Sequence, residues 1–167
     1  MVDPGTGRPV AEGERGEVWL RGPELFCGYA ARAQTREATT RGWFRTGDLG
    51  TLEGGWLTIV GRMKELIIRA GENIASAEVE RVLERHPAVR QAVVVGRPDD
   101  RVGERVAAFV VADGPFDLEE CRRFFADQGV ARFKTPELVV RVDEVPVLGI
   151  GKPDRARLRS QAASLAL

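Results

Sequence analysis

The order of apolar and turn-forming segments in residues 63–167 constrains the fold more than any other feature of the sequence. Short apolar runs that predict strands alternate with segments of helical spacing. The predicted strands are residues 66–68, 89–96, 104–112 and 138–142, and the predicted helices begin at Ser76, Asp117 and Pro153. The order strand, helix, strand, strand, helix, strand, helix predicts an α+β domain, in which helices flank a short sheet.

The two internal helices carry recognisable start and stop signals. Ser76 suits a helix N-terminus, and Glu78 and Glu80 place carboxylates in the first turn, where the helix dipole favours negative charge. Asp117 is a preferred capping residue, and Gly129 suits the end of the second helix. These signals support the predicted helices independently of their apolar spacing.

Residues 1–62 are predicted to form turns and short strands. Residues 16–22 and 56–60 have the pattern of half-buried strands, and Gly54-Gly55 predicts a tight turn before the second of them. Residues 30–40 are expected to form a short helix or a surface loop. We therefore expect a β-rich segment ahead of the α+β domain.

Composition and charge exclude several classes of protein. The chain has 25 basic and 25 acidic side chains, so it lacks the basic surplus of a nucleic-acid binder. Its longest apolar run, residues 106–112, is far shorter than the roughly 20 residues that a membrane span requires. Two separated cysteines, a single histidine and the lack of a leader sequence predict free thiols, no metal site of the protein's own and a cytoplasmic location.

Lysine is rare in this chain. Arginine accounts for 22 of the 25 basic residues, and the lysines are Lys64, Lys134 and Lys152. A lysine in such a background suits a position that needs a compact charge on a thin stem. Lys152 follows a glycine-rich loop, but Pro146 and Pro153 break the pattern of a phosphate-binding P-loop. Taken alone, Lys152 is an exposed lysine at the tip of that loop.

Three segments together resemble one family. Residues 42–50 resemble the ribose-binding motif of the adenylate-forming enzymes, which include acyl- and aryl-CoA synthetases, luciferases and peptide-synthetase adenylation domains. Residues 61–74 resemble their hinge and the hairpin after it, and residues 146–152 resemble the loop that bears their catalytic lysine. Residues that extend the likeness are Gly16-Glu17, Gly28-Tyr29, Asp154, Arg155 and Leu158. The resemblance covers nearly the whole chain.

This resemblance implies a division of the chain. Residues 1–62 correspond to the C-terminal end of the large AMP-binding domain, and residues 63–167 correspond to the mobile C-terminal domain. In the family, the large domain carries the phosphate loop, the adenine site and the acyl pocket, and nothing in this sequence matches those parts. We therefore expect the chain to be a piece of a longer enzyme and to be inactive alone.

The resemblance also implies the residues that act on ATP. Asp48 and Arg62 are expected to bind the ribose hydroxyls of ATP, and Mg²⁺ is expected to accompany ATP on ligands outside this chain. Lys152 is the expected catalytic residue, because a cation between a carboxylate and the α-phosphate offsets the repulsion of two anions. Outside these motifs, Asp48 would be an ordinary turn aspartate and Arg62 a surface arginine.

Further implied roles concern the second half of the reaction. Lys64 occupies the family's hinge position, where the C-terminal domain swings between two poses. In the second pose the hairpin of Gly71, Glu72 and Asn73 is expected to line a channel for the thiol of CoA. Glycine at position 71 allows the backbone to approach the pantetheine arm closely.

The expected function is that of an ATP-dependent acid:CoA ligase, of which this chain is the C-terminal portion. Its expected partners are a small carboxylic acid, such as a fatty or aromatic acid, CoA, and the missing N-terminal domain. An adenylation domain that loads a carrier protein and a stand-alone, non-catalytic binding module are the alternatives. Two residues depart from the family pattern: Leu148 stands where threonine is usual, and Ala70 where glycine is common.

Overall fold

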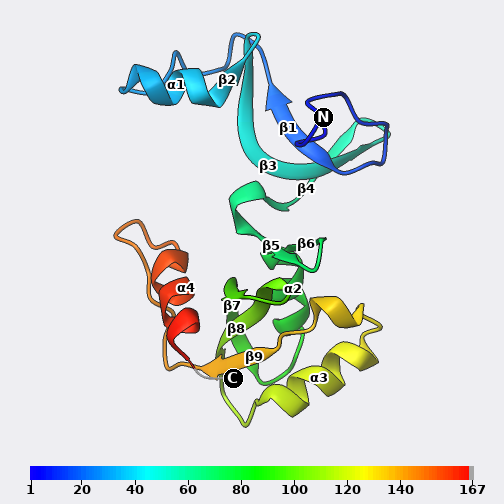
Figure 1. Cartoon of the computed structure of the whole chain (residues 1–167), viewed down its shortest axis with the longest axis vertical. Coiled ribbons are helices and arrows are strands. Elements are labelled where there is room, and N and C mark those ends of the chain that lie inside the picture. Colours follow the sequence, from blue (N-terminus) through cyan, green and yellow to red (C-terminus); the bar gives the residue numbers. More distant parts are fainter. Residues whose placement is uncertain (166–167) are drawn as a thin grey trace. The chain divides into compact units, whose positions relative to one another are not determined.

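The computed structural model describes residues 1–165, and the chain divides into two compact units. Unit 1 comprises residues 1–64, and unit 2 begins at Glu65. The division therefore falls after Lys64, whereas the family resemblance places it after residue 62. Figure 1 shows the elements of both units along the chain.

Unit 1 is built on an antiparallel sheet in which one strand pairs with all the others. β1 (Gly16–Leu20), β2 (Thr39–Thr40) and β4 (Trp56–Arg62) each pair with β3 (Trp43–Glu53). The helix α1 (Arg32–Ala38) precedes β2, so residues 30–40 form a helix for most of their length. A short 3₁₀ helix, η1 (Met63–Glu65), follows β4.

Strand β3 bends and keeps three partners, which simple alternation does not predict. Its pairing shifts register between Leu49 and Gly50 on the β4 side. Gly47 has a φ of 72°, a region that favours glycine. A Cβ atom at Gly50 would lie 2.8 Å from the carbonyl oxygen of Thr58. These glycines weaken the sequence signal for a strand, and they also permit the bend and the close approach of β4.

The strands of unit 2 form one mixed sheet in the order β6-β5-β8-β7, with β9 beside β8. The strands are β5 (Leu66–Arg69), β6 (Glu72–Ala75), β7 (Val89–Asp99), β8 (Gly103–Ala112) and β9 (Leu138–Arg141). The helical elements are α2 (Ser76–Leu83), α3 (Leu118–Asp127), the 3₁₀ helix η2 (Arg132–Lys134) and α4 (Arg155–Ser164). β8 and β9 run parallel, and the other pairs are antiparallel. The predicted α+β class is confirmed.

The strands predicted from the sequence include residues 66–68 but do not include strand β6. Glu72 and Asn73 belong to β6, where they pair with Arg69 and Ile68 of β5. Glutamate and asparagine are poor strand formers, so local propensity argues against this strand. Pairing with β5 outweighs that propensity, and the turn is confined to Ala70 and Gly71.

Both faces of the unit 2 sheet are buried. Along β7, Ala92 and Val94 enter one core, while Val93 and Val95 enter another. The first core also holds side chains of α2 and α3, and the second holds side chains of α4: Val79, Val82, Leu83, Cys121 and Phe125 in the first, and Leu158 and Ala162 in the second. Alternate strand residues point to opposite faces, so burial on both sides explains the continuous apolar run of β7. Within residues 1–165, no helix combines the length and the apolar character needed to cross a bilayer.

Candidate functional site

Strands β3 and β4 of unit 1 place Asp48 and Arg62 opposite each other. The Nε atom of Arg62 lies 2.7 Å from a carboxylate oxygen of Asp48, so the two side chains form an ion pair. The Asp48 side chain is 26% exposed and that of Arg62 is 59% exposed, so both are accessible to a ligand. The side-chain hydroxyl of Thr46 fixes the local backbone, since it accepts from the Asp48 N–H at 3.0 Å and donates to the Val18 carbonyl at 2.7 Å.

A buried carboxylate, Glu17, holds the segment before Asp48. Its side chain is 2% exposed, and it accepts from the Trp19 indole at 2.8 Å, from Nε of Arg45 at 3.3 Å and from the Gly47 N–H at 3.2 Å. Burying a carboxylate is costly unless it is paired and hydrogen-bonded. Glu17 therefore acts as a support for the Asp48 turn. The sequence analysis includes Glu17 in a family likeness but assigns it no role, because two of its partners, Arg45 and Gly47, lie 28 and 30 residues away.

Lys64 and the residue after it mark the passage from unit 1 to unit 2. Lys64 is exposed within η1. Glu65, the first residue of unit 2, is held by the Ser76 hydroxyl, which donates to its backbone carbonyl at 2.7 Å. Ser76 is itself 2% exposed, at the start of α2. The chain is thus anchored in unit 2 directly after the exposed lysine.

The hairpin of β5 and β6 presents Gly71, Glu72 and Asn73, and all three are exposed. Its two turn residues, Ala70 and Gly71, have φ values of 48° and 86°. A two-residue hairpin turn with positive φ at both positions has the twist that matches its strands. Ala70 holds this conformation at a cost of roughly 1–2 kcal/mol relative to ordinary backbone, which glycine would avoid.

Backbone contacts between this hairpin and the rest of the sheet lie near the hairpin's turn, while Ile67 and Ile74 are buried in the core. β5 pairs with β8 at Arg69 and Gly103, and the Ala70 N–H donates to the Val102 carbonyl at 2.7 Å. The Ile68 N–H donates to a carboxylate oxygen of Glu104 at 2.8 Å. The Glu104 side chain occupies the space that a Cβ on Gly96 would fill, since that Cβ would lie 2.4 Å from it.

Lys152 projects from a small loop that is closed by its own backbone. The Leu148 N–H donates to the Lys152 carbonyl at 2.8 Å, and the Gly151 N–H donates to the Leu148 carbonyl at 2.8 Å. At the base of the loop, Val147 and Pro153 form a bridge. Gly151 adopts a φ of 77°, which this tight closure requires. Lys152 itself is exposed.

The predicted site residues are thus distributed over both units. Asp48 and Arg62 form an ion pair in unit 1, whereas the hairpin of Gly71 and the loop of Lys152 lie in unit 2. Among residues 1–165 there is no cluster of three or more His, Cys, Asp and Glu residues that could hold a metal ion.

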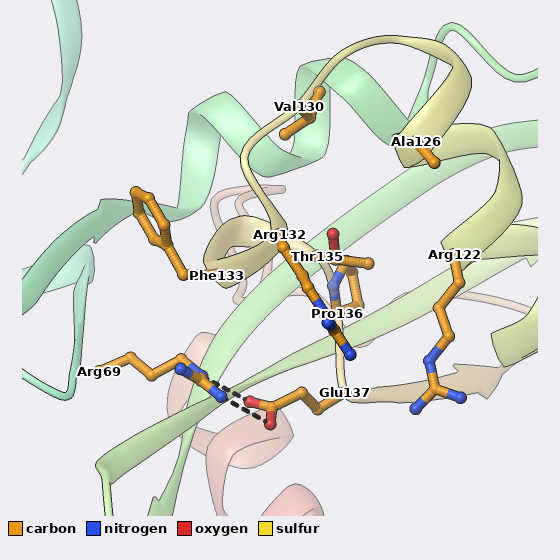
Figure 2. Close-up of a pocket in the computed structure, with 9 residues that line it drawn as sticks. All are labelled: Arg69, Arg122, Ala126, Val130, Arg132, Phe133, Thr135, Pro136 and Glu137. Atoms are coloured by element: carbon orange, nitrogen blue, oxygen red, sulfur yellow. Dashed lines mark hydrogen bonds and ion pairs between the residues drawn. The ribbon is translucent and has the colours of Figure 1, made fainter.

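A hollow of about 970 Å³ in unit 2 is absent from the sequence-based predictions. It is lined by Arg69, Arg122, Ala126, Val130, Arg132, Phe133, Thr135, Pro136 and Glu137 (Figure 2). Arg69 donates two hydrogen bonds to Glu137, at 2.9 and 3.0 Å, and Arg105 donates a third at 3.1 Å. These donors hold the pKa of the Glu137 carboxyl below its usual range, and the hydrogen bonds from Arg69 contribute most.

The arginines of this hollow differ in their availability. Arg69 is engaged by Glu137, and Arg122 pairs with Glu119 of the same helix at 3.1 Å. Arg132 lines the hollow and is exposed. The wall therefore offers guanidinium groups and the Phe133 ring to an anionic ligand. The residues that line the hollow lie up to 68 positions apart in sequence, so no contiguous motif predicts it.

Residues 78–152 match the sequence model of the AMP-binding enzyme C-terminal domain. This chain belongs to the adenylate-forming, AMP-binding enzymes. It is 44% identical over 162 residues to triostin synthetase I of Streptomyces triostinicus, covering 95% of this chain and 31% of that protein. It is 40% identical over 158 residues to the medium-chain fatty-acid–CoA ligase of Escherichia coli K12, covering 91% of this chain and 28% of that enzyme.

The fold of the chain is also that of solved adenylate-forming enzymes. The ATP-bound crystal structure of MatB from Rhodopseudomonas palustris matches with a TM-score of 0.89 at 33% identity, over 98% of this chain and 33% of MatB. The chain thus spans about a third of the length of the adenylate-forming relatives that it matches.

Proposed function

We propose that this chain is the C-terminal portion of an ATP-dependent acid:CoA ligase, with residues 1–62 as the end of its large domain and residues 63–167 as its mobile domain. Such an enzyme joins a carboxylic acid to ATP to give acyl-AMP and pyrophosphate, and then transfers the acyl group to the thiol of CoA. The observation that carries the proposal is an exposed lysine, Lys152, at the tip of a closed loop within a domain of the adenylate-forming family.

In the first half-reaction, Asp48 and Arg62 bind the ribose and Lys152 acts on the reacting groups. The ionised Asp48 accepts hydrogen bonds from the two ribose hydroxyls. Arg62 orients the Asp48 carboxylate and donates to the same sugar. A carboxylate oxygen of the acid attacks the α-phosphorus, and the bond to the oxygen of the leaving pyrophosphate breaks. Lys152 lowers the barrier by neutralising charge between the carboxylate and the α-phosphate.

In the second half-reaction, the hairpin of Gly71, Glu72 and Asn73 takes the place of the Lys152 loop. The CoA sulfur attacks the acyl carbonyl carbon, the thiol proton is lost, and AMP leaves. Lys64 is the hinge between the two poses, since an exposed residue at a unit boundary can change its dihedral angles without disturbing a core.

The hollow of unit 2 favours CoA over a carrier protein as the acceptor. CoA carries phosphate groups and an adenine ring, and guanidinium groups bind phosphate while aromatic faces stack on rings. Arg132 and Phe133 offer both kinds of contact. The pantetheine arm of a carrier protein has no adenine and no 3′-phosphate, so it would not use the contacts that Arg132 and Phe133 offer.

A hybrid enzyme tests the proposal. In the medium-chain fatty-acid–CoA ligase of E. coli, the segment that matches this chain is replaced by this chain, and octanoate, ATP and CoA are supplied. We expect ATP-dependent octanoyl-CoA formation, lost in the hybrid with Lys152→Gln. A hybrid that folds and binds ATP but forms neither adenylate nor thioester with Lys152 intact would contradict the proposal and favour a non-catalytic module.

The Arg132→Ala variant of the same hybrid tests whether CoA is the thiol acceptor. We expect the KM for CoA to rise by about tenfold, the usual size of losing one charge-assisted hydrogen bond. The KM for pantetheine should not change, because pantetheine lacks the phosphates. Equal effects on both thiols would remove the preference for CoA over a carrier protein.

A further inference from the structure

Arg155 begins helix α4 three residues after Lys152, and its guanidinium is the most extensively bonded cation near that lysine. Its two terminal nitrogens donate to the two carboxylate oxygens of Glu80 at 2.8 and 3.1 Å. One of them also donates to the Val94 carbonyl at 2.9 Å. These contacts tie the first residue of α4 to α2 and to β7.

The receiving carboxylate is itself fixed. A Glu80 oxygen accepts from the Val94 N–H at 2.7 Å, and the Glu80 side chain is 13% exposed. The Arg155 side chain is 24% exposed. A forked guanidinium that meets both oxygens of a fixed, sheltered carboxylate has one favoured orientation, which a lysine cannot reproduce.

The loop of Lys152 starts and ends close to this anchor. The Asp154 N–H donates to the Pro146 carbonyl at 2.8 Å, so the two ends of the loop are joined one residue before Arg155. The ring of Pro153 restricts φ at the intervening position. Within residues 1–165, no comparable attachment holds the outer part of the loop, where Val147, Leu148 and Ile150 are exposed. Its orientation relative to the sheet therefore depends on the anchor at its base.

Arg155 also reaches the hinge side of the unit. Its Nε atom lies 3.5 Å from a carboxylate oxygen of Glu65, the residue that follows Lys64. The backbone of Glu65 is held in turn by Ser76. One side chain thus connects the first residue of unit 2 with the segment that carries Lys152.

We propose that Arg155 is a positioning residue that aims the Lys152 loop, through its forked contact with Glu80 and the Val94 carbonyl, and links that loop to the residue after the hinge. This inference rests on the proposed function for its catalytic meaning. Arg155 itself need not touch a substrate. Its effect is to limit the directions in which Lys152 can point.

Hydrogen exchange on the purified chain tests the anchor without any assay of activity. The variants are Arg155→Lys and, as a matched control, Arg159→Lys at an exposed position of the same helix. We expect the amides of Leu148 and Gly151, which close the loop, to exchange about tenfold faster in Arg155→Lys only, since local opening sets their rate. The amides of β7 and β8 should keep their protection.

Two outcomes of this exchange experiment overturn the inference. In one, Arg155→Lys leaves the loop amides as protected as Arg159→Lys does. In the other, it exposes β7 and β8 as much as the loop, which would make Arg155 a general structural residue. Should Arg155→Lys not fold, Glu80→Gln keeps the size of the partner and an oxygen for Val94, and Glu119→Gln on α3 is its control. The exchange of the loop amides is then compared with that in the control and with that of β7 and β8, and the same two outcomes overturn the inference.

The catalytic meaning is tested in the hybrid ligase. Arg155→Lys should lower the maximal rate of adenylate formation by about tenfold, with the KM for ATP little changed, because positioning acts on the reacting geometry and not on nucleotide binding. Thioester formation from supplied octanoyl-adenylate should be unaffected. An equal loss in both half-reactions overturns the positioning role. An inactive hybrid with Arg155 intact instead contradicts the proposed function, and leaves the exchange experiment to decide on the anchor.

Discussion

Arg62 forms an ion pair with Asp48, its Nε atom 2.7 Å from a carboxylate oxygen, across two paired strands in which the residues lie opposite each other. The contact orients the carboxylate, and the exposed side of the pair remains open to a ligand. A ribose that binds there meets an acceptor already aligned. Since reorientation is not needed on binding, the pair favours affinity for the sugar.

Replacing Asp48 by asparagine in the hybrid ligase should raise the KM for ATP by about 10- to 100-fold, because hydrogen bonds to a charged acceptor are worth about 1.5–3 kcal/mol. The control is Glu53→Gln, at the exposed end of the same strand. Steady-state kinetics with varied ATP provide the measurement. A KM that matches the control would remove Asp48 from the nucleotide site.

The chain alone should show no ATP–pyrophosphate exchange with any carboxylic acid. We propose that residues 1–62 are the end of the large domain and residues 63–167 the mobile domain, so the phosphate loop and acyl pocket are expected in the remaining part of the enzyme. Exchange is measured with radiolabelled pyrophosphate against the Lys152→Ala variant. Exchange above that control would show that the chain holds more of the active site than we propose.

The two cysteines should differ in reactivity. Burial raises the pKa of the Cys121 thiol to about 12, whereas Cys27 is exposed. The thiolate is the reactive form, and at pH 8 a thiol with such a pKa is deprotonated in only about one molecule in 10⁴. Iodoacetamide should therefore label Cys27 in the folded chain and both cysteines in urea, as read by peptide mass spectrometry. Rapid labelling of Cys121 under native conditions would contradict its burial in the core.

Acid should destabilise unit 2 through Glu137. Its pKa is lowered in the folded state, mainly by the hydrogen bonds from Arg69, so the folded state binds this proton more weakly than the unfolded chain does. The stabilisation is present above the unfolded pKa of about 4.3 and is lost as the pH falls through the folded value. Urea unfolding between pH 3 and pH 6 should show a smaller dependence on pH in Glu137→Gln. The control is Glu119→Gln, whose side chain is 83% exposed, and equal slopes in the two variants would contradict the account.

In unit 2, the sequence predicts those helices and strands whose local sequence signals and whose burial both favour the observed structure. The valines of β7 and β8 are buried on both faces, and Asp117 caps α3 by accepting from the Glu120 N–H at 2.8 Å. Strand β6 is an exception. Glu72 and Asn73 have low strand propensity, but pairing with β5 outweighs it. Strand β3 is obscured in the same way by Gly47 and Gly50, which its bend requires.

The sequence identifies candidate site residues within its motifs but does not identify the residues that hold them in place. Asp48, Arg62 and Lys152 belong to contiguous segments that resemble the family, so short windows of sequence are enough to find them. Glu17 and Arg155 also lie in or beside such segments. Their roles depend on distant partners, such as Arg45, 28 residues from Glu17, and Glu80, 75 residues from Arg155, which only the folded chain brings into contact.

Separating the two half-reactions tests the central claim most directly, namely that one unit of this chain serves both steps through two different loops. In the hybrid ligase, Lys152→Ala should lower adenylate formation by about 10²–10³, the usual effect of losing one preorganised electrostatic contact. It should leave thioester formation from supplied octanoyl-adenylate nearly unchanged. Lys64→Pro should do the reverse, because fixing φ at the hinge blocks the change of pose. Equal losses in the same half-reaction from both variants would contradict the claim.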